Sequence, residues 1–165
     1  MDENRALLLE QLLPDEEATR ALAGRLARLA QGGDVFALYG DLGAGKSVFA
    51  RAFIHARAHM DGAPAEEVPS PTFTLVQTYA YRSGTIWHFD LYRLGGADEV
   101  WELGLEEALA GGITLMEWPD RLGGWLPAGT LGVHLAHGPS AEARVVSLVG
   151  PGAWQMRLAL EAAGG

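Results

Sequence analysis

Eight consecutive residues read Gly-Asp-Leu-Gly-Ala-Gly-Lys-Ser and fit the pattern G-x-x-x-x-G-K-[ST] without a gap. Glycines let successive backbone N–H groups turn inward around a phosphate, and a helix that starts directly after them points its positive end at the same anion. Lys46 adds a mobile ammonium group, and Ser47 offers a hydroxyl to Mg²⁺. The sequence therefore predicts a binding loop for the phosphates of ATP or GTP, made of Gly40, Asp41, Leu42, Gly43, Ala44, Gly45, Lys46 and Ser47.

A triphosphate site also needs Mg²⁺, which prefers hard oxygen ligands, commonly one or two carboxylates. Glu117 follows the apolar run 113–116, so we expect its carboxylate at the end of a strand facing the phosphate loop. Asp90 ends the alternating run 86–89, which places it on the same sheet face as His88. For either acid alone, a solvated carboxylate at a strand end remains the alternative.

Thr72 lies in the segment Ser-Pro-Thr-Phe at 70–73, where many phosphate-loop proteins respond to the terminal phosphate through a hydroxyl. Spacing alone favours a plain threonine at the entry of a strand, after a turn proline. The closest pairings of histidines carry no acidic or thiol companions, so we interpret the histidines as structural or exposed. The tryptophans at 101, 118, 125 and 154 are expected to be packing residues, because no basic stripe accompanies them.

The elements around these residues predict a single α/β domain over residues 1–165, with a mixed sheet of the phosphate-loop NTPase type and helices packed on it. Strands are expected at 6–13, where a short helix is the alternative, and at 35–39 and 113–116. Hairpins are expected at 73–81 with 85–91, and at 131–136 with 143–149. Helices are expected from Asp15 to Gly32, at 47–58, at 97–109 with an interruption at Gly104, and at 154–162. The inner face of the helix at 47–58 is either the stripe of Val48 or that of Phe49.

Composition narrows the setting of this domain. The 48% hydrophobic content suffices for a buried core, and the net charge of −9 opposes direct capture of a nucleic-acid backbone. The chain has no cysteine, so a disulfide framework or thiolate metal site is excluded and a reducing cytoplasm is the simplest setting. The N-terminal residues 1–4 are acidic, and the apolar stretch that follows is too short for a signal peptide or a membrane span.

Four segments in order and spacing resemble the bacterial TsaE family, the small ATPases of tRNA threonylcarbamoyladenosine synthesis. They are the phosphate loop, Ser-Pro-Thr-Phe-Thr-Leu-Val at 70–76, His-Phe-Asp-Leu-Tyr-Arg-Leu at 88–94, and Glu-Trp-Pro at 117–119. The phosphate loop is common to many enzymes, whereas the second and third segments together are far more specific. The likeness covers nearly the whole chain.

The resemblance implies roles for individual residues. Lys46 would hold the β- and γ-phosphates, Ser47, Asp90 and Glu117 would form the Mg²⁺ environment, and Thr72 would belong to a switch-like loop that senses the terminal phosphate. Asp41 would position water or brace the turn. Glu16 would lie near the base or ribose, and Arg144 would reach the nucleotide from the last hairpin. The family more often has threonine at position 47, but serine can also coordinate Mg²⁺.

The resemblance also implies a partner, a heterodimer of two related sugar-kinase-like subunits of the TsaB–TsaD type, which transfers the threonylcarbamoyl group. ATP hydrolysis would reset that complex, and tRNA would contact the partners only. Two other functions remain open: a small-molecule kinase, since fold does not settle the phosphate acceptor, and a nucleotide-dependent scaffold without useful hydrolysis. The chain has no arginine-rich lid of the kind that such kinases use.

Overall fold

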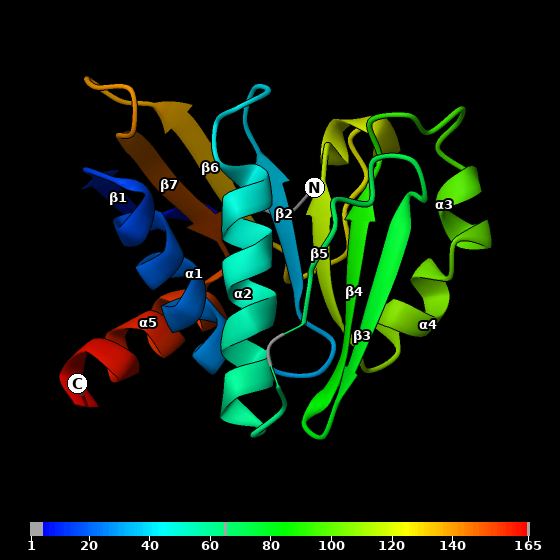
Figure 1. Ribbon diagram of the computed structural model, residues 1–165, viewed down its shortest axis with the longest axis horizontal. Coiled ribbons are helices and arrows are strands. Elements are labelled where there is room, and N and C mark those ends of the chain that lie inside the picture. The colour runs from blue at the N-terminus through cyan, green and yellow to red at the C-terminus, as the bar shows by residue number, and fades with distance from the viewer. Residues whose placement is uncertain (1–4, 65, 165) are drawn as a thin grey trace.

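The chain folds around one mixed sheet of seven strands, seen in the computed structural model in Figure 1. The structure describes residues 5–64 and 66–164, so the acidic N-terminal residues lie outside the described part. The strands are β1 (Ala6–Leu13), β2 (Val35–Tyr39), β3 (Val76–Tyr81), β4 (Gly84–Asp90), β5 (Ile113–Glu117), β6 (Leu131–His137) and β7 (Arg144–Gly150). Their order across the sheet is β1-β7-β6-β2-β5-β4-β3. The predicted α/β fold with a mixed sheet is confirmed.

The four central strands are parallel, and the outer pairs are antiparallel hairpins or edge pairs. Strand β2 pairs in parallel with both β5 and β6, and β5 pairs in parallel with β4. The edge strands β1 and β3 are antiparallel to β7 and β4, and β6 and β7 form the second hairpin. The carboxyl ends of β2, β4 and β5 therefore meet at one edge of the sheet, where open α/β sheets bind ligands.

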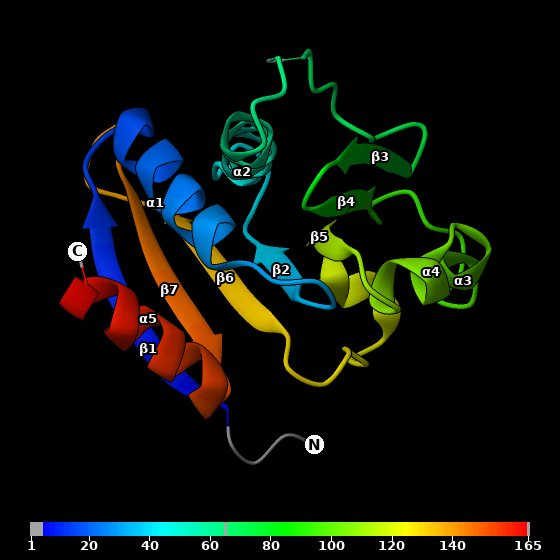
Figure 2. The same cartoon turned by 90° about the horizontal axis from the view of Figure 1, so that it is seen from below.

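Helices cover both faces of this sheet. They are α1 (Glu16–Leu29), α2 (Lys46–Met60), α3 (Glu99–Glu102), α4 (Leu105–Leu109) and α5 (Gly152–Gly164), with a 3-10 turn η1 (Pro119–Leu122). In Figures 1 and 2, α1, α2 and α5 gather over one half of the sheet, and α3 and α4 lie together beyond β4. Within the described part of the chain, no helix is both long and apolar enough to cross a lipid bilayer.

Local signals explain the starts and stops of the first helices. The side chain of Asp15 caps α1 by accepting a hydrogen bond from the N–H of Ala18 at 2.8 Å, and two glutamates follow in the first turn. In α2 the stripe that contains Phe49 and Phe53 is buried, whereas Val48 is only half-buried. The sequence predicted either the Val48 stripe or the Phe49 stripe as the inner face of α2, and in the structure it is the Phe49 stripe.

Two apolar cores lie on opposite faces of the sheet. In the first core, Phe36 of β2 packs edge-on against Phe53 of α2 and Trp154 of α5, with ring centroids 4.9 and 5.3 Å apart. In the second core, Phe89 of β4 and Met116 of β5 pack with residues of α3 and α4. Burial on both faces is most complete in the parallel strand β5, whose five residues are all buried, as is typical of a sheet covered on both sides.

One predicted strand boundary is wrong. We expected a strand from residue 73, but β3 begins at Val76, and residues 72–74 form a turn. The N–H of Leu75 donates to the carbonyl of Pro71 at 2.7 Å, and Leu75 has a left-handed backbone with φ of 70°. The turn leaves Phe73 81% exposed. Elsewhere the predicted strands and helices are confirmed to within a few residues, including the choice of strand at 6–13 and the break at Gly104.

Candidate functional site

The phosphate loop connects β2 to α2 and depends on two glycine conformations. Gly40 and Gly45 have φ of 151° and 108°. A Cβ on Gly40 would lie 2.7 Å from the carbonyl oxygen of Leu135, so a side chain would not fit there. Gly45 begins α2 without a side-chain cap, which leaves the first N–H groups of the helix available to an anion.

Lys46 is buried beneath the side chain of Trp118. Its ammonium nitrogen donates a hydrogen bond to the carbonyl of Gly40 and lies 3.5 Å from the centroid of a Trp118 ring. Trp118 has a left-handed backbone with φ of 58°, and it directly precedes η1. Burial lowers the pKa of Lys46, while the nearby carboxylates of Glu117, Asp90 and Asp41 act in the opposite direction.

The two predicted acidic ligands lie side by side. Asp90 and Glu117 are the last residues of β4 and β5, they are direct partners in the parallel register, and both are buried. The phosphate-loop cleft, of about 230 Å³, brings them together with Lys46 and Ser47. Its full lining is Leu42, Gly43, Gly45, Lys46, Ser47, Val48, Ser70, Thr72, Asp90, Glu117, Trp118 and Arg144. The alternative of solvated strand-end carboxylates is therefore wrong.

Thr72 reaches the same cleft from the turn before β3. Its hydroxyl donates to Asp90 Oδ2 at 3.3 Å and lies 2.7 Å from the hydroxyl of Ser70. Asp90 is held on its other side by the N–H of Tyr92, which donates to Oδ1 at 3.0 Å. Because residues 72–74 form a turn, Thr72 is not the strand-entry threonine that spacing alone favours.

His88 contacts Glu117, a link that sequence reasoning missed. Its Nε2 lies 2.7 Å from Glu117 Oε2, and both side chains are buried. The alternation along β4 places His88 and Asp90 on one sheet face, and that signal could have found the contact once β4 was paired with β5. His88 is buried, and its contact gives it a place beside a carboxylate of the site.

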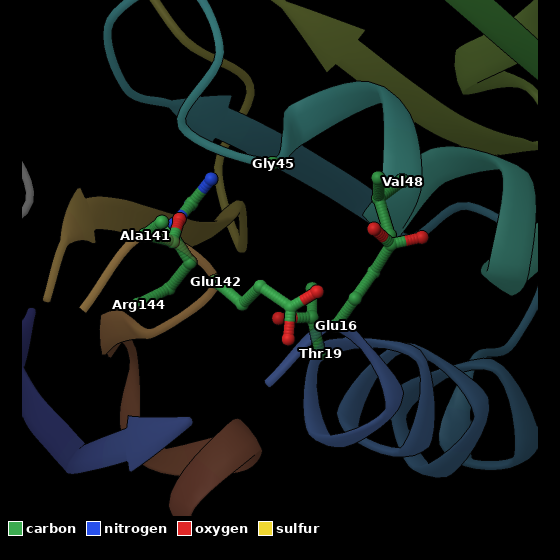
Figure 3. Close-up of a pocket in the computed structure, with 7 residues that line it drawn as sticks. All are labelled: Glu16, Thr19, Gly45, Val48, Ala141, Glu142 and Arg144. Carbon is green, nitrogen blue, oxygen red and sulfur yellow. The ribbon is translucent and has the colours of Figure 1, made fainter. Parts of the chain in front are cut away.

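A second cleft adjoins the first and contains Glu16, predicted near the base or ribose, and Arg144, predicted to reach the nucleotide. Figure 3 shows Glu16 and Thr19 at the start of α1, Glu142 and Arg144 around β7, and Gly45 of the phosphate loop. This side cleft measures about 170 Å³ and shares Gly45, Val48 and Arg144 with the phosphate-loop cleft. Glu16 also forms an ion pair with Arg20 on the surface of α1.

Arg144 binds the backbone of the phosphate loop. Its Nε donates to the carbonyl of Ala44 and its Nη2 to the carbonyl of Gly43, each at 3.0 Å. Its Nη1 donates to the carbonyls of Ala141 and Ala143 within its own hairpin. Asp41, by contrast, is exposed and lines neither cleft; its carbonyl accepts the N–H of Ala44 at 3.0 Å.

Two of the tryptophans predicted to be packing residues are partly exposed at the surface. Trp154 is 1% exposed, but Trp101 and Trp125 are 46% and 45% exposed and face a cleft on α3.

Comparison with known proteins adds an independent observation. Residues 13–146 match the model of the family described as threonylcarbamoyl adenosine biosynthesis protein TsaE. A tRNA threonylcarbamoyladenosine biosynthesis protein TsaE from Rickettsia felis is 46% identical over 109 residues, which are 66% of this chain and 61% of that protein. The chain thus spans about three fifths of that relative.

Other relatives match at similar levels. The protein of the same name from Rickettsia bellii is 40% identical over 76% of this chain and 85% of its own, and that from Bacillus subtilis is 38% identical over 67% and 66%. Among solved structures, that of YdiB from Bacillus subtilis superposes with a TM-score of 0.75 at 25% identity and covers 99% of both chains.

Proposed function

The chain belongs to the TsaE family of threonylcarbamoyl adenosine biosynthesis proteins, and from this premise we propose that it is a Mg²⁺-dependent ATPase subunit acting in tRNA threonylcarbamoyladenosine biosynthesis in the cytoplasm. One observation carries the proposal. A single cleft joins the phosphate loop to a threonine hydroxyl and to two carboxylates at the ends of parallel strands. These are the parts that phosphate-loop enzymes use to hydrolyse a nucleoside triphosphate.

The residues at hand fit a magnesium ion. Ser47, Asp90 and Glu117 supply only hard oxygen donors and line one cleft. Within residues 5–64 and 66–164, no group of three or more His, Cys, Asp or Glu could hold a metal unaided. That fits Mg²⁺, which usually shares its ligands with substrate phosphates and water and neutralises the charge on the phosphate oxygens.

The chain's own residues then divide the work on ATP. Lys46 moves from the carbonyl of Gly40 to the β- and γ-phosphates, and the free N–H groups at the start of α2 bind the same oxygens. Thr72, already bonded to Asp90, senses the terminal phosphate, and Glu117 orients the attacking water. Asp41, exposed at the loop, either positions water or braces the turn.

The side cleft is proposed to receive the ribose and base. The carboxylate of Glu16 and the guanidinium of Arg144 flank it beside Gly45, within reach of a nucleotide whose phosphates lie in the loop. Carboxylate oxygens accept hydrogen bonds from sugar hydroxyls or an exocyclic amine. Arg144 touches the loop carbonyls as well, so it connects the two parts of the nucleotide site.

We further propose that hydrolysis resets a partner heterodimer of the TsaB–TsaD type between rounds of transfer. The net charge of −9 supports contact with tRNA through these partners instead of directly. In this arrangement the nucleotide state biases a conformational equilibrium of the complex.

Two variants test the proposal. Lys46→Ala should lower the rate of ATP hydrolysis by about 10²–10³-fold, because it removes the mobile cation of the site. Glu117→Gln keeps the side-chain shape and an oxygen for His88, so ATP binding should survive while phosphate release falls by at least about tenfold. Binding is measured by calorimetry and hydrolysis by phosphate release, with and without the partner heterodimer. Full hydrolysis by Lys46→Ala would refute the mechanism.

The same assays separate the alternatives. Phosphate that appears on a metabolite instead of in water would indicate a small-molecule kinase. Normal tRNA modification in cells that carry only Glu117→Gln would indicate a scaffold that needs nucleotide binding but no hydrolysis. We expect modification to fail in those cells.

A further inference from the structure

Two tryptophan side chains stand exposed side by side, away from the nucleotide clefts. Trp101 of α3 and Trp125 in the loop after η1 are 46% and 45% exposed, and their ring centroids are 5.5 Å apart with planes tilted by 49°. Tryptophan is highly buried on average in folded domains, and its exposed instances are enriched at binding surfaces. Two adjacent exposed indoles are therefore expected to form part of a binding surface.

The two rings border a small cleft with an apolar floor. The cleft measures about 290 Å³, and the buried side chains of Val100 and Leu122 form its base. Asp98 and Ala97 complete the lining. A volume at the lower end of the range for ligand pockets suits one side chain and not an extended small molecule.

The segment that carries α3 and α4 is strongly acidic, and in the sequence it lies between Arg93 and Arg121. Residues 94–120 contain seven carboxylates and no lysine, arginine or histidine. Five of these carboxylates are exposed on or beside α3 and α4: Asp98, Glu99, Glu102, Glu106 and Glu107. Within the described part of the chain, none of the five forms an ion pair. Glu99 accepts the N–H of Gly95 at 3.0 Å.

We propose that this tryptophan cleft is a docking site for a basic segment of a partner protein, with one arginine or lysine cation held against the indole faces. Indole is the best aromatic partner for a cation, and arginine adds planar stacking. The exposed carboxylates on and beside α3 and α4 attract the rest of a basic segment and raise its rate of encounter. The same carboxylates repel phosphate groups, so nucleic acid is the wrong class of occupant.

The docking site is independent of the nucleotide chemistry proposed above. The tryptophan cleft shares no lining residue with the phosphate-loop cleft or the side cleft. A failure of nucleotide binding would therefore leave this inference standing, and the reverse also holds.

The test uses the full chain labelled at the indole nitrogens and followed by NMR. The probe is an arginine–alanine decapeptide amide, and a glutamate–alanine peptide of equal length and a uridine oligonucleotide serve as comparisons. We expect the arginine peptide alone to shift the indole signals of Trp101 and Trp125, while the signal of buried Trp154 stays in place. Shifts produced equally by the oligonucleotide would overturn the choice of a protein partner.

Variants separate an aromatic site from simple charge attraction. The double variant Trp101→Ala/Trp125→Ala keeps every carboxylate and should weaken peptide binding by about tenfold or more. The single variant Trp125→Phe keeps an aromatic ring and should lose less affinity than the double alanine variant. The double variant Asp98→Asn/Glu102→Gln should weaken peptide binding and reduce the dependence of that binding on salt. If the folded double-alanine variant, checked by circular dichroism, binds the peptide as well as the parent chain, the proposal is wrong. It is equally wrong if sedimentation shows that these tryptophans instead hold two copies of the chain together.

Discussion

Lys46 is the chain's single lysine, and its side chain is buried. Its ammonium donates to the carbonyl of Gly40 and lies beneath the indole of Trp118, out of water. Burial lowers the pKa of Lys46, and Glu117 and Asp90 offset part of this effect by favouring the ammonium form. A triphosphate that replaces the carbonyl would supply far more negative charge. Nucleotide binding and protonation of this one group should therefore be coupled.

The first prediction is a depressed pKa for Lys46 that rises when nucleotide binds. With one lysine, carbon-13 labelled lysine gives a single side-chain NMR signal whose pH titration reports this pKa directly. In the free chain we expect a value below the ordinary 10.5, and in saturating Mg²⁺ and ATP a higher one. Between the folded and unfolded pKa the unfolded chain binds more protons, so this group makes the folded state more stable as pH rises.

The urea-unfolded chain supplies the reference for that titration, since it lacks the burial that lowers the pKa. A free-chain value at or above the urea value would mean that the ammonium is not desolvated. An unchanged value with ATP present would mean that the phosphates do not reach Lys46.

At the scale of elements, Arg144 joins the last hairpin to the phosphate loop. It begins β7 and donates to the carbonyls of Ala44 and Gly43, so the hairpin supports the loop from the side. Arg144→Ala should weaken ATP binding by about tenfold, because hydrogen bonds from a charged donor are worth about 1.5–3 kcal/mol each and part of that loss falls on the free loop. Calorimetric titration with ATP measures the effect.

Arg28→Ala is the matched control for Arg144→Ala. Arg28 is an exposed arginine in the last turn of α1 and lines neither nucleotide cleft, so its removal changes the net charge equally and should leave ATP affinity unchanged. Equal losses in the two variants would show that only the net charge matters.

The elements that could be predicted are those with local causes. Asp15 caps α1 with its own side chain, and the loop between β2 and α2 follows from glycine conformations and a helix start. The turn at Phe73 could not be predicted, because its left-handed Leu75 is held by a contact distant in sequence. The carbonyl of Leu75 accepts the N–H of Asp90 at 2.9 Å.

The candidate site divides in the same way. The identity of the loop residues needs only the sequence, whereas the meeting of Asp90 with Glu117 needs the parallel pairing of β4 with β5. The contact of His88 with Glu117 depends on the same register. Glu16 and Arg144 come from opposite ends of the chain, and no spacing rule connects them. The family resemblance implied a nucleotide role for each, and only the structure brings them to one cleft.

On the scale of the whole molecule, the phosphate-loop cleft lies at one edge of the sheet that separates the two cores. The carboxyl ends of β2, β4 and β5 carry the loop and both acids, with α1, α2 and α5 packed on one face and α3 and α4 on the other. Such a site keeps its geometry only while both faces stay covered. Helix α5, far from the chemistry, therefore matters for stability more than for catalysis.

Trp154→Ala tests that division. Trp154 is 1% exposed, packs on Phe36 at 5.3 Å, and is covered by the guanidinium of Arg157 at 4.3 Å. Its truncation should lower the free energy of unfolding by about 3–5 kcal/mol and the thermal midpoint by about 10 °C. Met156→Ala, on the same helix but 66% exposed, should cost no more than about 0.5 kcal/mol. Thermal and urea unfolding measure both, and ATP hydrolysis by the fraction that remains folded should be unchanged, since α5 lines neither nucleotide cleft. Equal stability of the two variants would mean that α5 does not close the first core.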